Sequence, residues 1–168
     1  MEKPVEIAPL TVADLPDVNA VVEQAVMGWN LPERVKRLSL PSYRYQTADL
    51  AHQAGLVARS AEGEVVGVAV WEPASHEPVG AEGSVFLLHG LYVAPAWQRR
   101  GVGARLLAAA RHVVCGAGAA GLLVRAQAEA VAFFRAMGLQ ELPVEDEKRD
   151  YPHRFFLACA SGKTGEAS

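Results

Sequence analysis

The stretch LLHGLYVAPAWQRRGVGARLLAAAR, Leu87–Arg111, decides the fold. Its first seven residues are apolar and β-prone, which predicts a strand ending at Val93. Pro95 interrupts it, because proline has no N–H to donate to a strand ladder. From Gly101 the apolar residues recur at helical spacing, beginning with Val102 and Leu106. The stretch therefore predicts a strand, a short loop and a helix.

The loop between strand and helix is rich in glycine and arginine. The first turn of a helix leaves backbone N–H groups without partners and carries partial positive charge. Gly101 and Gly103 have no Cβ atoms to hold a ligand away from these groups. Three arginines add formal positive charge: Arg99, Arg100 and Arg105. The loop suits a phosphate or diphosphate, although an ordinary solvated helix start would also fit these residues.

Two sharper phosphate motifs are absent from this loop. The Gly-Lys-Ser/Thr of a Walker loop is missing, and the dinucleotide pattern G-x-G-x-x-G has Leu106 at its last position. The residues instead fit Q/R-x-x-G-x-G/A, with Gln98, Gly101 and Gly103, after a strand that ends L-x-V at Leu91 and Val93. This order resembles the acetyl-CoA signature of the GNAT N-acetyltransferase superfamily.

The resemblance implies acetyl-CoA as co-substrate. In the family the loop amides hold the diphosphate, and the pantetheine arm bonds to strand backbone, as an added strand would. The family manner also implies that the N–H of Val93 polarises the thioester carbonyl. The cofactor-binding residues implied here are Leu91, Tyr92, Val93, Gln98, Arg99, Arg100, Gly101, Val102, Gly103 and Ala104.

A second family motif, N-x-x-A-x-x-x-Y-x-x-x-G-F, aligns with residues 127–139. Ala130 and Gly138 match it, and Gln127 keeps the amide of the usual asparagine. Phe134 stands where a tyrosine often protonates the leaving thiolate, and phenylalanine has no proton to donate; taken alone, Phe134 is a core residue. The further cofactor contacts implied are Gln127, Ala130, Phe133 and Phe134.

Transfer to an amine requires a base, because an ammonium nitrogen has no free electron pair. The glutamate that some family members use corresponds to Leu87. His89 lies two residues on, on the same strand face, and LHGLYV is similar to the L-H-x-L-x-V of arylalkylamine acetyltransferases. His89 is therefore the predicted base. A hydrogen-bonded histidine in a half-buried strand is the alternative.

Tyrosines elsewhere could supply the missing acid. Tyr151 lies in a loop that often borders the acceptor in the family, and it is predicted to be catalytic. Tyr43 and Tyr45, with Trp29, lie in the region that lines acceptor pockets there, and they remain alternatives. No metal site is predicted.

The rest of the chain predicts a mixed α/β (α+β) fold of GNAT type. Its mostly antiparallel central sheet has helices on both faces and one parallel βαβ unit at the cofactor site. Residues 1–160 are predicted to form one domain, and residues 161–168 a disordered tail. Strands are predicted at 5–8, 55–60, 64–72, 84–93, 122–124, 139–142 and 153–160, and helices at 11–27, 31–38, 49–54, 101–115 and 128–137.

Composition limits the class of partner and the compartment. The 168 residues carry a net charge of −3, which predicts no general attraction to nucleic acid or to an anionic membrane. Neither a signal sequence nor a membrane-spanning helix is expected. Cys115 and Cys159 are expected to be reduced packing residues, which favours the cytoplasm. The last strand could pair across a homodimer.

The sequence therefore predicts an N-acetyltransferase that moves an acetyl group directly from acetyl-CoA to a primary amine of a small molecule. One alternative is a non-catalytic acyl-CoA sensor, motivated by the missing glutamate and tyrosine. A second is a generic nucleotide-binding α/β module, which tight ADP binding without regard to the pantetheine arm would indicate. Activity lost in His89→Ala with cofactor binding intact would favour the enzyme.

Overall fold

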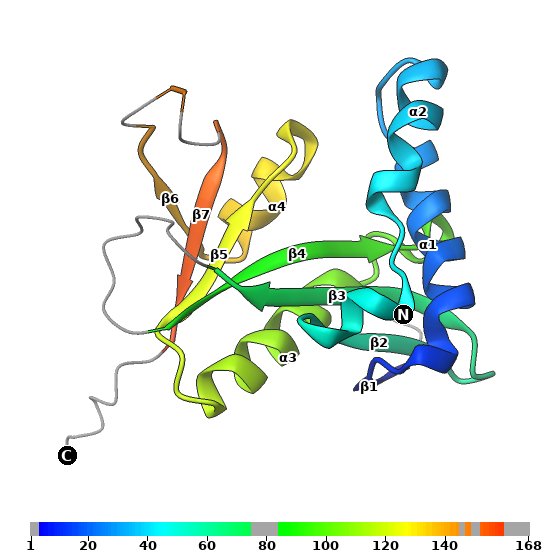
Figure 1. Cartoon of the computed structure of the whole chain (residues 1–168), viewed down its shortest axis with the longest axis horizontal. Coiled ribbons are helices and arrows are strands. Elements are labelled where there is room, and N and C mark those ends of the chain that lie inside the picture. Colours follow the sequence, from blue (N-terminus) through cyan, green and yellow to red (C-terminus); the bar gives the residue numbers. More distant parts are fainter. Residues whose placement is uncertain (1–3, 75–83, 145–146, 149–151, 160–168) are drawn as a thin grey trace. The chain divides into compact units, whose positions relative to one another are not determined.

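The structure is a computed structural model and describes residues 4–74, 84–144, 147–148 and 152–159. Figure 1 shows its elements. The helices are α1 (Leu15–Met27), α2 (Glu33–Tyr43), α3 (Val102–Gly116) and α4 (Val131–Ala136), with 3-10 turns η1 (Val12–Asp14), η2 (Thr47–Ala51), η3 (Pro95–Trp97) and η4 (Ala128–Ala130). The strands are β1 (Val5–Pro9), β2 (Ala54–Ser60), β3 (Val65–Pro73), β4 (Val85–Val93), β5 (Gly121–Arg125), β6 (Gln140–Leu142) and β7 (Arg154–Ala158).

The strands form one sheet in the order β1-β2-β3-β4-β5-β7-β6. Strands β4 and β5 are parallel, with Val85 opposite Gly121, because α3 connects them. The pairs β1–β2, β5–β7 and β6–β7 are antiparallel. The predicted fold class, a mixed and mostly antiparallel sheet with one parallel pair, is confirmed.

The chain folds into two compact units. The first comprises Met1–Val70 with Gly90–Ala110, and the second comprises Trp71–His89 with Arg111–Ser168. The prediction of a single domain over residues 1–160 stays a prediction, and residues 161–168 lie outside the described part of the chain.

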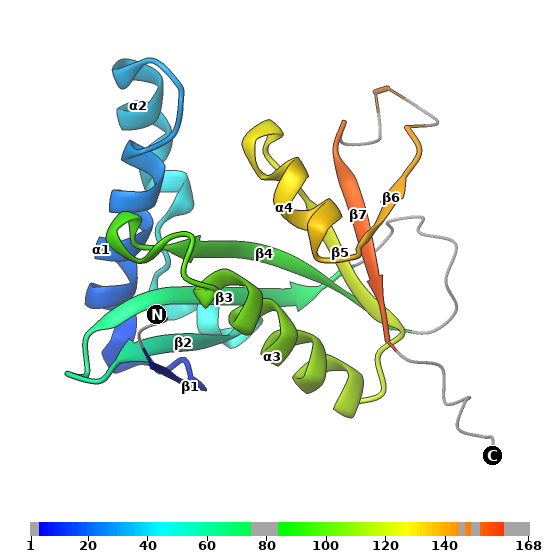
Figure 2. The ribbon, with the colours of Figure 1, turned by 180° about the vertical axis from the view of Figure 1, so that it is seen from behind.

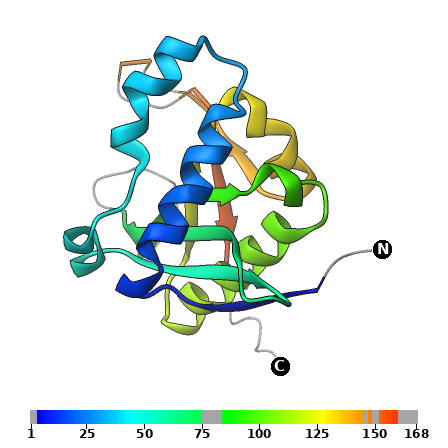
Figure 3. The same cartoon turned by 90° about the vertical axis from the view of Figure 1, so that its right-hand side faces the viewer.

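The core of the first unit lies beneath α1. One face of this helix is apolar and buried, with Val18, Val22 and Val26 fully inaccessible, and it packs on side chains of β2 and β3 such as Val57 and Val68. Figure 3 shows α1 and α2 side by side in this unit. The buried valines and leucines supply most of the stabilisation of the first unit, since each such side chain contributes about 1.5–3 kcal/mol on burial.

The other face of β3 meets α3 closely. A Cβ on Gly67 would lie 2.9 Å from Leu106 Cδ1 and 3.1 Å from Val102 Cγ1. A glycine in a strand interior weakens the strand, and here it allows the helix to approach the backbone. The start of α3, with the loop before it, is thereby fixed against β3.

The second unit has an aromatic core around β5 and β7. Phe155 and the β5 residues Leu122 and Leu123 are fully buried. Figure 2 shows β5, β7 and β6 side by side. A Cβ on Gly121 would lie 2.5 Å from the Phe156 ring, so this glycine is needed where the ring crosses β5.

Helix α2 continues to Tyr43, beyond the end at residue 38 that the sequence predicts, and Pro41 lies in its last turn. Proline has no N–H, so Pro41 removes one backbone hydrogen bond, the one that would reach the carbonyl oxygen four residues before it. Side chains add bonds in this turn: Ser39 Oγ donates to the Val35 carbonyl oxygen at 2.8 Å, and Ser42 Oγ donates to that of Ser39 at 2.6 Å.

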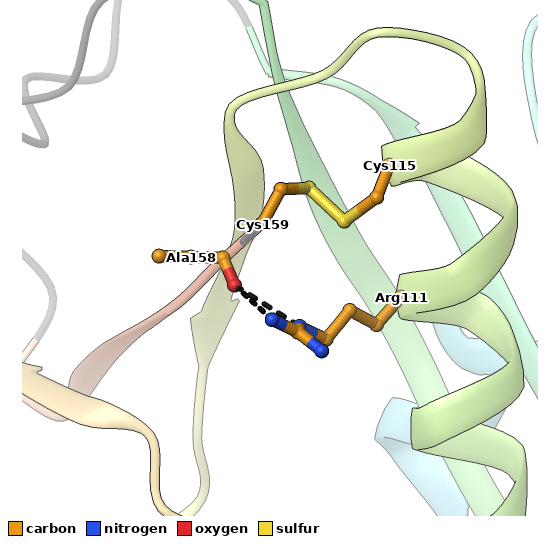
Figure 4. The surroundings of a disulfide bond; sticks show 4 residues. All are labelled: Arg111, Cys115, Ala158 and Cys159. Carbon is orange, nitrogen blue, oxygen red and sulfur yellow. Dashed lines mark hydrogen bonds between the residues drawn. A yellow bond between two sulfur atoms is a disulfide. The ribbon is translucent and has the colours of Figure 1, made fainter. Parts of the chain in front are cut away.

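The two cysteines form a disulfide, so the prediction of two reduced packing cysteines is wrong. Cys115 lies near the end of α3, and Cys159 directly follows β7 (Figure 4). Their Cα atoms are 5.5 Å apart, although 44 positions separate them in sequence. Pairing of β5 with β7 brings Cys159 back to the start of β5, where its N–H donates to the Ala120 carbonyl oxygen at 2.8 Å.

Arg111 reinforces this connection. Its Nε and Nη2 donate to the carbonyl oxygen of Ala158 at 3.0 and 2.9 Å, one helical turn before Cys115 (Figure 4). The expectation of a cytoplasmic protein rested partly on reduced thiols, and disulfides persist chiefly in oxidising compartments. That support is removed, and the cytoplasmic location stays a prediction.

Candidate functional site

The glycine loop has an unusual backbone. Arg99 has φ 63° and Gly101 has φ 83°, so left-handed residues stand on both sides of Arg100. The left-handed conformation costs a non-glycine residue about 1–2 kcal/mol. Alternation of this kind turns successive N–H groups to one side and makes a concavity for an anion. The strain at Arg99, directly before a helix start, supports an anion site in this loop.

Gln98 ties the loop to the end of β4. Its Nε2 donates to the carbonyl oxygen of Val93 at 3.0 Å. The Arg100 guanidinium lies over the Trp97 ring, 5.9 Å from its centroid. Thus Gln98 fixes the angle at which the chain leaves the strand, and Arg100 is held beside the loop by a cation–π contact.

Arg105 is bound elsewhere in the first unit. Its Nη1 donates to the carbonyl oxygen of Val5 in β1 at 2.9 Å. Of the three arginines that the sequence assigns to the charge of the loop, this one connects α3 to the first strand. Gly103 and Ala104 are half-buried, and the Val102 side chain is buried against Gly67.

One edge of strand β4 faces β3, and alternate backbone N–H groups of β4 point to the opposite edge. The N–H of Ala94 donates to the carbonyl oxygen of Val66 at 2.9 Å. Because N–H groups alternate between the two edges of a strand, those of Leu91 and Val93 face the edge opposite β3. The ladder between β4 and β5 pairs Val85–Leu88 with Gly121–Val124, and β4 continues to Val93.

His89, the predicted base, is exposed and lies on β4 between buried Leu88 and buried Gly90. Leu87, at the position of the family glutamate, is buried with 8% of its surface accessible. Thus the His89 imidazole is exposed to solvent, whereas Leu87, two residues earlier, has no titratable group.

The second-motif residues lie in the second unit. Phe134 is buried, and its ring centroid is 5.8 Å from that of Phe155 and 5.1 Å from that of Phe133. The prediction that Phe134 is a core residue is confirmed. Gln127 is exposed before η4, while Ala130 and Phe133 are half-buried. Gly138 has φ 85° after α4, as predicted for a helix end.

Four aromatic residues gather in the first unit between α1, α2 and β4. Tyr45 and Tyr92 are buried in its core, with Trp29 and Tyr43 packed against it. The Trp29 and Tyr43 rings meet edge to face, with centroids 5.3 Å apart. Burial, and to a smaller extent the nearby Tyr43, raises the pKa of Tyr92, so Tyr92 stays protonated. Its side chain is a core residue.

Two features of this aromatic group depend on tertiary contacts that the sequence motifs do not specify. The Asn19 side chain holds the backbone of Tyr45, accepting its N–H at 2.8 Å and donating to its carbonyl oxygen at 2.8 Å. A Cβ on Gly90 would collide with the Tyr45 hydroxyl oxygen, and it would lie 2.6 Å from Tyr92 Cε2. A lone glycine in an apolar strand is a signal of close approach, and Gly90 carries that signal.

The remaining predicted catalytic residue, Tyr151, lies outside the described residues. Within the described ranges, no group of three or more His, Cys, Asp or Glu side chains could hold a metal ion. Across the same ranges, every helix is too short or too polar to cross a bilayer.

Comparison with known proteins gives a consistent result. The sequence model of the acetyltransferase (GNAT) family matches residues 23–139. A search of curated proteins returned no match. Among solved structures, the fold is similar to that of a GNAT-family protein from Desulfovibrio desulfuricans, with TM-score 0.67, 22% identity and coverage of 94% of this chain and 100% of the other.

Two further similar structures contain a cofactor. PaiA N-acetyltransferase from Thermoplasma acidophilum, in complex with coenzyme A, has TM-score 0.70 and 15% identity, with 92% of this chain and 99% of the other covered. A GNAT-family acetyltransferase from Brucella melitensis, in complex with acetyl-CoA, has TM-score 0.63 and 22% identity, with 93% and 88% covered. At these identities the likeness shows the fold.

Proposed function

The chain belongs to the GNAT family of acetyl-CoA-dependent N-acetyltransferases, and we propose that its acceptor is the primary amine of a small molecule. The amine would attack the thioester carbonyl directly, without an acyl-enzyme. The observation that carries the proposed site is the loop at the start of α3, where Arg99 and Gly101 are both left-handed.

In this proposal the loop holds the diphosphate of acetyl-CoA. Its backbone N–H groups, the start of α3 and the guanidinium groups of Arg99 and Arg100 provide the positive potential that a diphosphate requires. Gln98 acts by fixing the loop to Val93. Val102, Gly103 and Ala104 form the first turn of the helix. We retain four second-unit residues as proposed cofactor contacts through their match to the family motif: Gln127, Ala130, Phe133 and Phe134.

The pantetheine arm would extend along the edge of β4 that faces away from β3. The N–H groups of Leu91 and Val93 lie on that edge, with Tyr92 between them facing the other way. The diphosphate would lie just beyond Val93, and the thioester is the far end of the arm. This order favours the N–H of Leu91 as the group that polarises the thioester carbonyl, in place of Val93, which would bind the arm.

We propose His89 as the group that accepts the proton of the attacking amine. Its exposure on β4 allows it to exchange protons with solvent, as a base needs to do between turnovers. The rest of the rate enhancement would come from holding the amine and the thioester together in the reacting geometry, which can lower the barrier by about 7–11 kcal/mol.

The acceptor class is supported by charge. A net charge of −3 does not attract a polyanionic acceptor such as RNA, whereas it favours the approach of a cationic amine. Trp29 and Tyr43, half-buried in edge-to-face contact, offer aromatic surface on which an amine-bearing small molecule could bind.

Thermal unfolding with saturating acetyl-CoA, and with ADP as control, tests the cofactor site. A ligand at a hundredfold excess over its Kd stabilises the native state by ~2.7 kcal/mol, which raises Tm by roughly 5–10 °C for a chain of this size. We expect a clearly larger shift with acetyl-CoA than with ADP. Equal shifts would favour a generic nucleotide module, and the absence of both would contradict the proposed site.

An amine panel tests the reaction. We expect release of free CoA with at least one small primary amine, and a loss of roughly 10²-fold in kcat in His89→Ala with the acetyl-CoA shift preserved. His112→Ala, which removes another exposed histidine, is the matched control. Full activity in His89→Ala would overturn the base assignment, and binding without turnover of any acceptor would favour the sensor alternative.

A further inference from the structure

We propose that Tyr45 is the proton donor to the sulfur of coenzyme A. The inference rests on the proposed function, because it requires the thioester to lie along β4. It assigns the acid role to the segment between α2 and β2, whereas the sequence predicts Tyr151 for that role and names Tyr45 only as an alternative.

Phe134 leaves the acid role open. Its ring packs at a tilt against that of Phe155 in the core of the second unit, and a phenyl ring has no proton to transfer. A thiolate can leave unassisted near neutral pH, since the pKa of a thiol is about 8.5. A positioned acid still lowers the barrier, by the equivalent of roughly 10²–10⁴ in rate.

The Tyr45 hydroxyl reaches β4 itself. A Cβ on Gly90 would collide with this hydroxyl oxygen, so the oxygen occupies space that a side chain at Gly90 would take. A glycine inside a strand lowers the strand's stability, and at Gly90 it makes room for the Tyr45 hydroxyl. The next residue along the strand is Leu91, whose N–H we assign to the thioester carbonyl. Gly90 and Leu91 are consecutive residues of β4, so the hydroxyl lies against the residue that directly precedes Leu91.

The placement of Tyr45 is rigid. Only 3% of its surface is accessible. Asn19 from α1 bonds to both its backbone N–H and its carbonyl oxygen, each at 2.8 Å. Two hydrogen bonds from one side chain fix the position from which the ring extends, and a proton donor needs a fixed position to act in the transition state.

The step balances in atoms and charge. The amine nitrogen forms a bond to the thioester carbon, the C–S bond breaks, and its electron pair stays on sulfur. Sulfur takes the proton of the Tyr45 hydroxyl. The amine nitrogen loses one proton to solvent and the tyrosinate takes one proton back from solvent, so amide and free CoA leave with the enzyme in its starting state.

Tyr45→Phe tests the proposal while keeping the ring that fills the core. We expect kcat to fall by roughly 10²-fold, with the KM for the amine and the acetyl-CoA thermal shift unchanged. Ser42→Ala is the control, since it removes an exposed hydroxyl three residues before Tyr45 that takes no part in the proposed site, and its kcat should stay within about threefold of the unaltered protein.

The pH profile separates chemistry from structure. Tyrosine donates only while protonated, so kcat of the unaltered protein should decline at alkaline pH, and this decline should be absent in Tyr45→Phe. A merely structural role would lower kcat at every pH and leave the decline in place, which would overturn the proposal. A rise in the KM for the amine with kcat preserved would also overturn it, because Tyr45 would then orient the acceptor.

The two proposals fail in distinguishable ways. Turnover by the unaltered protein with full kcat in Tyr45→Phe would refute the inference alone. An unaltered protein that neither binds acetyl-CoA nor turns over would refute the proposed function and the inference together.

Discussion

The side chain of Asn19 is bonded to both backbone polar groups of Tyr45, at 2.8 Å each, across 26 residues of sequence. An amide side chain can donate through its NH2 group and accept through its carbonyl oxygen at the same time. It joins α1 to the segment that follows α2, and it holds a buried residue whose hydroxyl reaches β4.

Asn19→Ala should destabilise the protein by about 1–3 kcal/mol, because it leaves the N–H and carbonyl of a buried residue without these partners. Asn19→Asp keeps the acceptor and loses the donor, so its free energy of unfolding should lie between those of Asn19→Ala and the unaltered protein. Urea unfolding measures both. If Tyr45 acts as proposed, kcat should decrease in both variants at temperatures where they are folded; stability equal to the unaltered protein would contradict the role of Asn19.

The arginines near the glycine loop should separate into two kinds. Arg105→Met should lower stability by about 1 kcal/mol, because Arg105 donates to the Val5 carbonyl oxygen, and should leave acetyl-CoA affinity unchanged. Arg99→Met should weaken acetyl-CoA binding roughly tenfold and reduce its dependence on salt, with stability unchanged. Calorimetric titration at two salt concentrations measures the affinities, and similar losses in both variants would contradict this division.

The ion pair of Asp14 with Arg59 should make stability depend on pH. Burial of Asp14 favours its neutral form, but hydrogen bonds from the Thr11 N–H, at 2.9 Å, and from Arg59 outweigh burial. The pKa of Asp14 is therefore lowered from its ordinary value of 3.8. A carboxylate with a lowered folded-state pKa stabilises the fold above the unfolded pKa, and that contribution is lost as pH falls through the folded value.

Urea unfolding at a series of pH values from 7 downward checks this dependence. We expect the free energy of unfolding to decrease below about pH 4. The decrease should be smaller in Asp14→Asn, which cannot ionise and should already be less stable at pH 7. Parallel curves for the two proteins would show that Asp14 is not the group responsible.

Reduction of the disulfide should destabilise the protein without abolishing its cofactor site. The chain-entropy account gives about 4 kcal/mol for a closed loop of this length, and measured values are often smaller. The double variant Cys115→Ser/Cys159→Ser should show the same loss of Tm as treatment with a thiol reductant, and reductant should not affect the variant further. An unchanged Tm in reductant would contradict a stabilising disulfide.

Local sequence pattern predicts much of the fold. The period of the apolar residues indicates α1 and α3, and the β-α-β order around the glycine loop indicates the parallel pair of β4 and β5. The loop residues that could face a diphosphate also follow from sequence. The left-handed conformation of Arg99 does not, because non-glycine residues rarely adopt it.

Features that depend on tertiary contact are missed for a common reason. The Cys115–Cys159 bond follows from the pairing of β7 with β5, and no local pattern encodes which strand takes that place. The approach of Tyr45 to Gly90 likewise depends on where the segment after α2 crosses the sheet. Only the lone glycine within a strand gives a local sign of it.

The bond between Cys115 and Cys159 also gives the chain a closed covalent ring. Strands β5, β6 and β7 with helix α4 all lie inside it, between the two cysteines. A protease that cuts once within the ring would leave a single covalently joined molecule, heavier only by the water that hydrolysis adds, until the disulfide is reduced. A cut outside the ring would release a fragment at once. Digestion followed by gels with and without reductant would thus report which part of the chain was cut.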